Sequence, residues 1–411
     1  MGSLTTACRS CGFKATESIL DLGKTPLANS LLTEAELNRP EASYPLELVF
    51  CPSCALVQIT ETVPPEELFR DYLYFSSFSE TLVNRAGVLA NEMIQARNLD
   101  GGSLAMEIAS NDGYLLQHYV KAGVPVLGIE PARNIAKVAR EERGIRTISE
   151  FFGAELASQL ASDGERANIL HANNVLAHVP DLNGFVRGIG TVLASEGVGV
   201  IEVPYVKDLI DHCEFDTIYH EHLCYYSLTA LDTLFRRHGL LVHDVERVPI
   251  HGGSLRLFVS RAGEVKVSER VSVLLAEEEA WGVGDIAFYK AFAGRVEALK
   301  HSLRDTLGSL KADGYRIAAY GAAAKGSTLL NYFEIGTEMI DFVVDRSTYK
   351  QGRYMPGVRI PIRDPQEVLD AKPDFCLLLA WNFADEIMRQ QAAYKTTGGR
   401  FIVPIPDVRL V

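Results

Sequence analysis

The sequence lacks a long hydrophobic run, an excess of basic residues and an even number of cysteines, and each absence removes a class of protein. No apolar stretch approaches the roughly 20 residues that a membrane-spanning helix needs, and the first residues, MGSLTTACRSCG, contain no basic region followed by an apolar core. We therefore expect a cytoplasmic protein without a membrane partner. The formal net charge of −13 argues against nucleic acid as a partner, because nucleic acid attracts positive charge. Seven cysteines in an intracellular chain argue against a disulfide framework.

Four of the seven cysteines form two C-x2-C pairs, in the segments CRSCG and CPSCALVQ. Two such pairs can place four thiolates tetrahedrally around Zn²⁺, and a closed four-sulfur site has no open position for a substrate. We therefore predict a structural zinc ion with the ligands Cys8, Cys11, Cys51 and Cys54. The other three cysteines lie in apolar or mixed surroundings and are predicted to be packing residues: Cys213, Cys224 and Cys376.

The chain has 411 residues, 47% of them hydrophobic, which is enough for two or three domains. Strands at 103–110, 124–131, 166–175 and 197–204 alternate with helices, as is typical of a doubly wound parallel sheet. A hairpin at 241–261 predicts that this sheet ends with an antiparallel strand. A charged helical stretch then leads to a second strand-and-helix series. We predict an α/β protein with an N-terminal zinc-binding module (1–77), a Rossmann-like domain (78–264), and a helical linker with a second Rossmann-like α/β domain (265–411).

A first nucleotide site is indicated in the segment EIASNDGYLLQHYVKAGVPVLGIEPA. Glu107 ends one strand, Gly113 lies in the following turn, and Glu130 ends the next strand at the spacing of a ribose-binding carboxylate. Ala109 and Asn111 stand where a dinucleotide fingerprint has its first two glycines. A ligand that carries a ribose but no phosphate therefore fits this loop better than a dinucleotide, and S-adenosylmethionine (SAM) is such a ligand.

The order of these motifs resembles one known family. E-x-A-x-N-x-G followed by G-I-E-P is similar to the first two motifs of class I SAM-dependent methyltransferases. Together with the two CxxC pairs, HANNVLAHVPD and YHEHLCYYS, it resembles the sugar C-methyltransferases that act on nucleotide-linked 4-keto deoxysugars. The resemblance implies a zinc-binding N-terminal module, a SAM-binding middle domain and a C-terminal domain that helps to hold the nucleotide sugar. It also implies that Glu130 binds the ribose, that Phe151 and Phe152 lie near the adenine, and that Asn173 lies beside the methionine portion.

The segment FDTIYHEHLCYYS shows neither strand alternation nor a helical stripe, and its polar side chains suit proton transfer. Methylation of carbon needs a base near the C–H bond and a hydrogen-bond donor near the ketone oxygen. His222 is the predicted general base, because imidazole titrates near neutral pH. Glu221 is predicted to orient that histidine or a sugar hydroxyl, and Tyr219 to donate to the developing enolate oxygen. His220 should point elsewhere if the segment is extended, because adjacent side chains then alternate.

The resemblance implies the same catalytic assignment and adds two pocket residues. Tyr219, Glu221 and His222 occupy the positions regarded as catalytic in that family. His178 and one tyrosine of DYLYFSS are implied to line the same pocket, and both Tyr72 and Tyr74 qualify. From the residues alone, a structural turn or a second metal site remains open for YHEH.

A second nucleotide site is indicated by AAYGAAAKGSTLLNYF, where small residues join a strand to a helix. Backbone N–H groups at such a helix start can hold phosphate. Lys325 and Ser327 are predicted to bind a diphosphate with the loop amides. Asp345, Arg346 and Lys350 follow the next strand and are predicted to contact the nucleotide. A domain that serves only as scaffold is the alternative.

These patterns favour a SAM-dependent C-methyltransferase of a dTDP-linked 4-keto-6-deoxysugar, acting at C-3, in deoxysugar biosynthesis for a natural product such as an antibiotic. The same enolate chemistry would serve C-5. An NAD-linked oxidoreductase and a non-catalytic zinc-containing nucleotide-sugar-binding protein are the alternatives. We expect a monomer or a small homo-oligomer.

Overall fold

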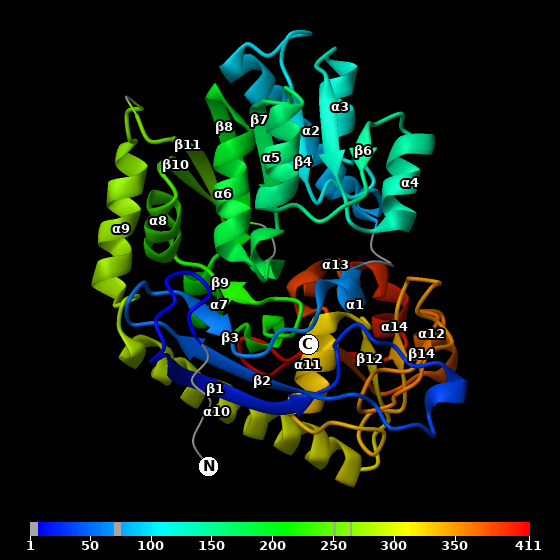
Figure 1. Cartoon of the computed structure of the whole chain (residues 1–411). Helices are drawn as coiled ribbons and strands as arrows, with labels where there is room; N and C mark the ends of the chain where they lie inside the picture. The colour runs from blue at the N-terminus through cyan, green and yellow to red at the C-terminus, as the bar shows by residue number, and fades with distance from the viewer. Residues whose placement is uncertain (1–6, 70–74, 250–251, 264) are drawn as a thin grey trace.

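A computed structural model describes residues 7–69, 75–249, 252–263 and 265–411, and it contains three β-sheets (Figure 1). The seven-stranded sheet and its helices, cyan to green in Figure 1, form the upper part of the molecule. The N-terminal sheet, in blue, and the C-terminal sheet, in orange to red, lie side by side below it. Within the described residues, no helix is both long enough and apolar enough to cross a membrane. Tyr72 and Tyr74 lie outside the described residues.

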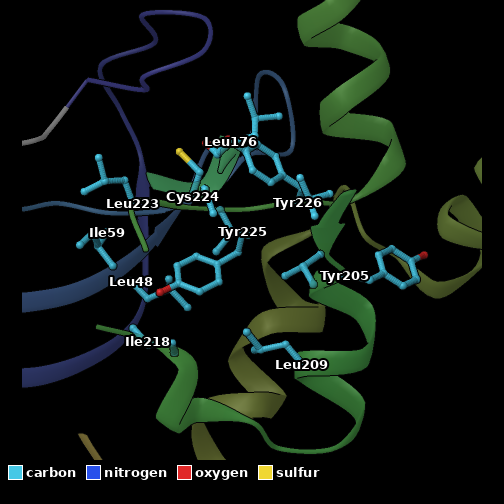
Figure 2. Packing of buried hydrophobic residues seen from close by; sticks show 14 of the residues in the cluster. Leu48, Ile59, Leu176, Tyr205, Leu209, Ile218, Leu223, Cys224, Tyr225 and Tyr226 are labelled. Atoms are coloured by element: carbon cyan, nitrogen blue, oxygen red, sulfur yellow. Dashed lines mark hydrogen bonds between the residues drawn. The ribbon is translucent and has the colours of Figure 1, made fainter. Parts of the chain in front are cut away.

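The N-terminal sheet is antiparallel and combines two distant parts of the sequence. Its order is β1 (Glu17–Thr25), β2 (Tyr44–Phe50), β3 (Val57–Ile59) and β9 (Cys224–Tyr225). In the last pair Val57 lies opposite Tyr225. Figure 2 shows Leu223 and Tyr225 close to Leu48 and Ile59 of the N-terminal strands. Within FDTIYHEHLCYYS, Cys224 and Tyr225 therefore form the edge strand of this sheet. The polar residues YHEH form the turn before that strand.

The seven-stranded sheet has the order β10-β11-β8-β7-β4-β5-β6. Strands β8, β7, β4, β5 and β6 are parallel, and β11 is antiparallel to both of its neighbours, as the hairpin predicted. All residues of β4 are buried, as expected for a parallel strand covered by helices on both faces. The strand bounds are β4 (Ala105–Ile108), β5 (Val126–Ile129), β6 (Thr147–Ile148), β7 (Ala167–Asn173), β8 (Leu193–Pro204), β10 (Leu240–Val248) and β11 (Ser254–Arg261).

Helices cover this sheet, and several of them begin at a side-chain cap. Ser79 accepts from the amide of Leu82 at the start of α2, and Ser227 accepts from the amide of Ala230 at the start of α8. The α-helices of this part are α1 (Pro65–Phe69), α2 (Glu80–Arg97), α3 (Leu116–Lys121), α4 (Arg133–Glu141), α5 (Ala154–Ser162), α6 (Leu182–Val192), α7 (Val206–Asp211) and α8 (Leu228–Arg237).

The helical linker consists of α9 (Glu269–Trp281) and α10 (Ile286–Ala312). Glu278 of α9 is fully buried and accepts hydrogen bonds from the amides of Leu228 and Thr229 at the start of α8. The long helix α10 runs beneath the N-terminal sheet in Figure 1, where the ring of Tyr289 lies 5.0 Å from that of Phe50. The linker thus packs against both of the preceding sheets.

The C-terminal sheet confirms the predicted second Rossmann-like α/β unit. Its order is β14-β13-β12-β15-β16-β17, and all pairs are parallel except the last. The strands are β12 (Ile317–Tyr320), β13 (Val343–Val344), β14 (Ile362–Arg363), β15 (Phe375–Leu378), β16 (Arg400–Val403) and β17 (Arg409–Leu410). The helices are α11 (Ala324–Tyr332), α12 (Glu367–Ala371), α13 (Ala384–Gln390) and α14 (Ala392–Thr396).

Both mixed sheets contain a point at which the strand order reverses. In one sheet it lies between β4 and β7, and in the other between β12 and β15. Ligands of open α/β sheets bind in the crevice beyond the carboxyl ends of the strands at such a point. The loops that follow these four strands are therefore where the two sheets should bind ligands.

Candidate active site between two sheets

One cavity of about 810 Å³ lies where the loops of both sheets meet. Its walls include residues that follow β4, β5 and β7 of the seven-stranded sheet and residues that follow β12 and β15 of the C-terminal sheet. The turn before β9 contributes a third wall. A single cavity therefore joins the first nucleotide site, the YHEH turn and part of the second nucleotide site.

The loop after β4 adopts a glycine-like backbone although two glycines are missing. Ala109, Asn111 and Gly113 have φ angles of 55°, 49° and 79°, all in the left-handed region. Asparagine tolerates this region, and alanine does so at some cost in free energy. The φ of Gly113 is one that other residues rarely adopt, and a Cβ atom there would also lie 2.2 Å from the Cδ1 atom of Ile145, so this position favours glycine. Ala109 and Asn111 line the cavity, whereas Gly113 shapes the turn behind it.

Glu130 faces the cavity from the end of β5. Its carboxylate accepts hydrogen bonds from the amides of Asn111 at 2.9 Å and Ala132 at 2.8 Å, and burial raises its pKa to about 7. Each carboxylate oxygen keeps acceptor capacity for a ribose hydroxyl. Glu107 lies deeper, is 1% exposed and does not line the cavity, and burial raises its pKa well above the usual value. The structure therefore places Glu107 beneath the cavity wall, with one carboxylate oxygen that has no hydrogen-bond partner among the described residues.

The remaining residues predicted for SAM also line the cavity. The ring of Phe152 packs edge-on against Phe185 with centroids 5.3 Å apart, and Phe151 lies beside it in the wall. Asn173, at the end of β7, has a buried side-chain oxygen without a hydrogen-bond partner among the described residues. Such an orphaned polar atom needs a partner from a ligand or water. Together with Glu130, these residues fit a ligand with a ribose, a flat base and a polar tail, as SAM has.

Tyr219 and His222 form a hydrogen-bonded pair in the cavity wall. The segment is a turn, in which the amide of His222 donates to the carbonyl of Tyr219 at 2.9 Å. The segment is therefore not extended, and the turn brings both side chains to one side with ring centroids 4.2 Å apart. The Nδ1 atom of His222 lies 2.9 Å from the carbonyl oxygen of Thr217 and therefore carries the proton. Its Nε2 atom, 3.0 Å from the Tyr219 hydroxyl, is left as the acceptor and can act as a base.

Glu221 does not orient His222. Its carboxylate accepts from the side-chain amide of Asn29 at 2.6 Å and is 5% exposed, and burial raises its pKa to about 7. The Thr217 carbonyl takes the orienting role that the sequence analysis gave to Glu221. His220 does not line the cavity, and its Nε2 atom lies 3.1 Å from the carbonyl oxygen of Pro45. These two residues tie the turn to the N-terminal module.

His178 lines the cavity next to the Tyr219–His222 pair. Its ring centroid lies 4.9 Å from that of His222, and its Nδ1 atom donates to the carbonyl of Glu221 at 2.7 Å. Burial lowers the pKa of His178 to about 4, so it is neutral at pH 7. A neutral ring at this position places no positive charge beside His222.

Lys325 is the residue of the predicted second nucleotide site that faces the cavity. It lies in the first turn of α11, directly after the reversal point of the C-terminal sheet. Its ammonium lies 4.8 Å from the centroid of the Trp381 ring and has no hydrogen-bond partner among the described residues. The backbone here is tight, because a Cβ atom on Gly321 would lie 2.8 Å from the Cβ atom of Ala380. A cation and a helix start thus meet at the cavity, which suits a phosphate group.

The other predicted residues of this site do not line the cavity. Asp345 accepts from the amides of Ala322 and Ser347, both at 2.8 Å, so its carboxylate holds the loop together. Lys350 donates to the carbonyl of Ala322 at 2.8 Å and lies 3.6 Å from the carboxylate of Asp345. Ser327 is buried on α11, and Arg346 is exposed. These residues follow β13 or lie inside α11, whereas the cavity opens between β12 and β15.

Several cavity residues were not predicted from the sequence. Asn382 and Phe383 follow β15, and Phe383 is 52% exposed although it lines the cavity. Glu214 is 4% exposed, and burial raises its pKa to about 7. The end of the strand FCLLLAW was a usable signal for Asn382 and Phe383, because residues at strand ends beside a reversal point face ligands. No local pattern marks Glu214.

The four predicted zinc ligands form a cluster in the N-terminal module. The Sγ atoms of Cys8, Cys11, Cys51 and Cys54 lie within 4.8 Å of one another. The closest pairs, Cys8 with Cys54 and Cys11 with Cys51, are each 3.5 Å apart. Sulfur atoms around one tetrahedral Zn²⁺, with bonds of about 2.3 Å, are separated by nearly this distance. The arrangement therefore fits a structural zinc ion.

Models of known families match three successive parts of the chain. A model of a zinc binding domain matches residues 8–69, a "Methyltransferase domain" matches residues 86–245, and a "C-methyltransferase C-terminal domain" matches residues 249–406. Together these matches extend over the zinc cluster, the seven-stranded sheet and the C-terminal sheet.

A curated protein resembles the chain over nearly its whole length. C-methyltransferase NovU of Streptomyces niveus is 38% identical over 405 residues, which are 98% of this chain and 96% of NovU. Ubiquinone biosynthesis O-methyltransferase of Bartonella quintana (strain Toulouse) is 28% identical over 93 residues, which are 23% of this chain and 38% of that protein. The crystal structure of magnesium protoporphyrin IX methyltransferase from Synechocystis PCC 6803 with bound SAM has a TM-score of 0.34 and 12% identity, covering 44% of this chain and 79% of that one.

Proposed function

The chain belongs to the family of zinc-binding, SAM-dependent C-methyltransferases, and from this premise we propose that it methylates a dTDP-linked 4-keto-6-deoxysugar. The proposed methylation site is C-3, with C-5 as the alternative that the same chemistry allows. The proposed role is deoxysugar biosynthesis for a natural product such as an antibiotic. Because the family consists of methyltransferases, the NAD-linked oxidoreductase and the non-catalytic binding protein are set aside.

The observation that carries the proposal is the continuity of the cavity. It joins the residues suited to SAM with the Tyr219–His222 pair and with the cation of Lys325. A substrate with a negatively charged diphosphate at one end and a ketone sugar at the other can place its diphosphate at Lys325 and its sugar at His222. The neutral His178 and the aromatic side chains of the walls offer the sugar a largely uncharged surface beside His222.

In the proposed reaction His222 takes the proton from the carbon next to the ketone. The C–H bond breaks, the proton moves to the Nε2 atom of His222, and the electron pair spreads onto the ketone oxygen as an enolate. The Thr217 carbonyl holds the Nδ1 proton and stabilises the imidazolium. The Tyr219 hydroxyl, which bonds to His222 in the structure, then donates to the enolate oxygen. Bound SAM supplies the methyl group that the enolate carbon takes.

Mass spectrometry with a panel of dTDP-4-keto-6-deoxysugars tests this proposal. The protein is incubated in D₂O with each sugar, with and without SAM. We expect a SAM-dependent gain of one methyl mass on at least one sugar and deuterium uptake beside its ketone. NMR of the product shows whether the new methyl group is at C-3 or C-5, and a C-5 product would contradict the proposed position but not the chemistry. Neither methyl transfer nor deuterium uptake with any panel member would contradict the proposed substrate class.

Replacing Lys325 with methionine should raise the KM for the nucleotide sugar about 10- to 100-fold and leave the Kd for SAM unchanged. The variant loses a charged contact to the diphosphate, and such contacts contribute roughly 1.5–3 kcal/mol. Steady-state kinetics at low and high salt measure the change, and the KM of the wild type should rise with salt more than that of the variant. The control is Lys395→Met, an exposed lysine of the same sheet domain. An unchanged KM in Lys325→Met would place the diphosphate elsewhere.

A further inference from the structure

The short 3-10 helix η4 (Phe215–Thr217) contains Thr217, whose carbonyl orients the proposed base His222. Side chains of the C-terminal sheet domain pack against η4. Phe215 stacks on Phe333, at the end of α11, with centroids 4.8 Å apart and planes 18° apart. It also packs against Tyr332 at 5.9 Å. The segment that orients His222 therefore packs against residues that lie more than 100 positions further along the chain.

A buried hydrogen bond also joins η4 to the C-terminal sheet domain. The indole Nε1 of Trp381 donates to the Oδ2 atom of Asp216 at 2.7 Å. Asp216 is fully buried, and its other oxygen has no hydrogen-bond partner among the described residues. Neither Asp216 nor Trp381 lines the cavity, so neither can touch the substrate directly. A buried carboxyl group costs free energy, and the hydrogen bond from the Trp381 indole offsets part of that cost.

The same tryptophan also supports the second ligand site. The Lys325 ammonium lies 4.8 Å from the centroid of its ring, within the range of a cation–π contact. One side chain thus contacts both the residue suited to the diphosphate and the turn that carries the orienting carbonyl. From Trp381 the path continues through Asp216 and the neighbouring Thr217 carbonyl to the Nδ1 atom of His222.

We propose that Asp216 and Trp381 are positioning residues for proton abstraction, acting as one unit that fixes the Thr217 carbonyl and through it His222. This inference rests on the proposed function, because it takes His222 as the base. It assigns the C-terminal domain a part in catalysis beyond holding the nucleotide. Small misplacements of a catalytic group cost up to about 10²-fold in rate, so the loss of this contact should appear in kcat and not in binding.

Trp381→Phe tests the inference, because phenylalanine keeps an aromatic ring near Lys325 while it removes the N–H donor together with part of the ring that packs against the core. We expect kcat for methyl transfer to fall at least tenfold, while the KM for the nucleotide sugar and the Kd for SAM stay near the wild-type values. Deuterium uptake by the sugar in D₂O without SAM should slow by the same factor, since it isolates the proton abstraction.

Asp216→Ala should match Trp381→Phe, and the double variant should be no slower than either single variant, as expected for residues that act as a unit.

Two further variants separate positioning from a general loss of stability. Asp216→Asn keeps an oxygen acceptor for Trp381 and should retain most of kcat. Tyr394→Phe removes another buried hydrogen bond of the same domain, to the carbonyl of Pro373 at 2.9 Å, and should leave kcat unchanged. A wild-type kcat in Trp381→Phe, slower methyl transfer with unchanged deuterium uptake, or an equal loss in Tyr394→Phe would each overturn the inference. Wild-type protein that is inactive on every sugar would instead overturn the proposed function and this inference with it.

Discussion

His222→Asn should lower kcat for methyl transfer by about 10²- to 10⁴-fold, the range that a general base contributes. Asparagine can still donate a hydrogen bond toward the Thr217 carbonyl, but its amide cannot take a proton at neutral pH. Deuterium uptake without SAM should fall by the same factor, because both reactions begin with the same proton abstraction. The Kd for SAM should not change, since the proposed function places the sugar, and not SAM, at His222. Steady-state kinetics, deuterium exchange and calorimetric titration of SAM measure the three quantities.

His220→Asn is the matched control, two residues away in the same turn. The ring of His220 bonds to the carbonyl of Pro45 and packs against Tyr44 with centroids 5.7 Å apart, outside the cavity. This variant should lower the Tm and leave kcat close to the wild-type value. Methyl transfer by His222→Asn at the wild-type rate would show that another group takes the proton, and the ring of His178 lies 4.9 Å from that of His222.

Removing the zinc ion should have the largest effect on stability. Wild-type protein should contain one zinc ion per chain, and Cys54→Ser should bind little of it. Zinc binding to four thiolates contributes folding free energy directly, about 10 kcal/mol or more in small zinc domains. We expect the Tm of Cys54→Ser to fall by on the order of 10 °C. Elemental analysis and thermal unfolding measure the two changes.

The zinc ion should also matter for activity, although the cluster does not line the cavity. The second C-x2-C pair directly precedes β3, and β3 pairs with β9, which follows the YHEH turn. Asn29 of the same module also donates a hydrogen bond to Glu221. Cys54→Ser should therefore lose methyl transfer together with its zinc. Cys376→Ser makes the same chemical change at a buried cysteine outside the cluster and should keep its zinc. Zinc-free wild-type protein, or Cys54→Ser with full zinc content and an unchanged Tm, would contradict a structural zinc site.

Short-range patterns were sufficient for much of the site. The two-residue spacing within each cysteine pair identified all four members of the cluster, because both ligands of a pair lie on one tight turn. The loop after β4 could be predicted as a ligand-binding loop although two glycines are missing. Ala109 and Asn111 adopt the left-handed backbone conformation that glycine commonly has at these positions. The placement of Glu130 followed from the regular spacing of a strand, a helix and the next strand. In each case the residues that meet are close in sequence or related by a repeating unit.

The sequence by itself determined the order of strands and helices, the cysteine cluster, the position of Glu130 after β5 and the location of the YHEH turn. Local spacing and apolar runs decide these features. Only the tertiary structure decided which groups meet around them. It gave His222 the Thr217 carbonyl as its partner, turned Glu221 toward Asn29, and joined Trp381 to Asp216. The physical reason is that a side chain's direction in an irregular turn depends on what packs against it. Here β3 and α11, far apart in the sequence, pack on either side of that turn.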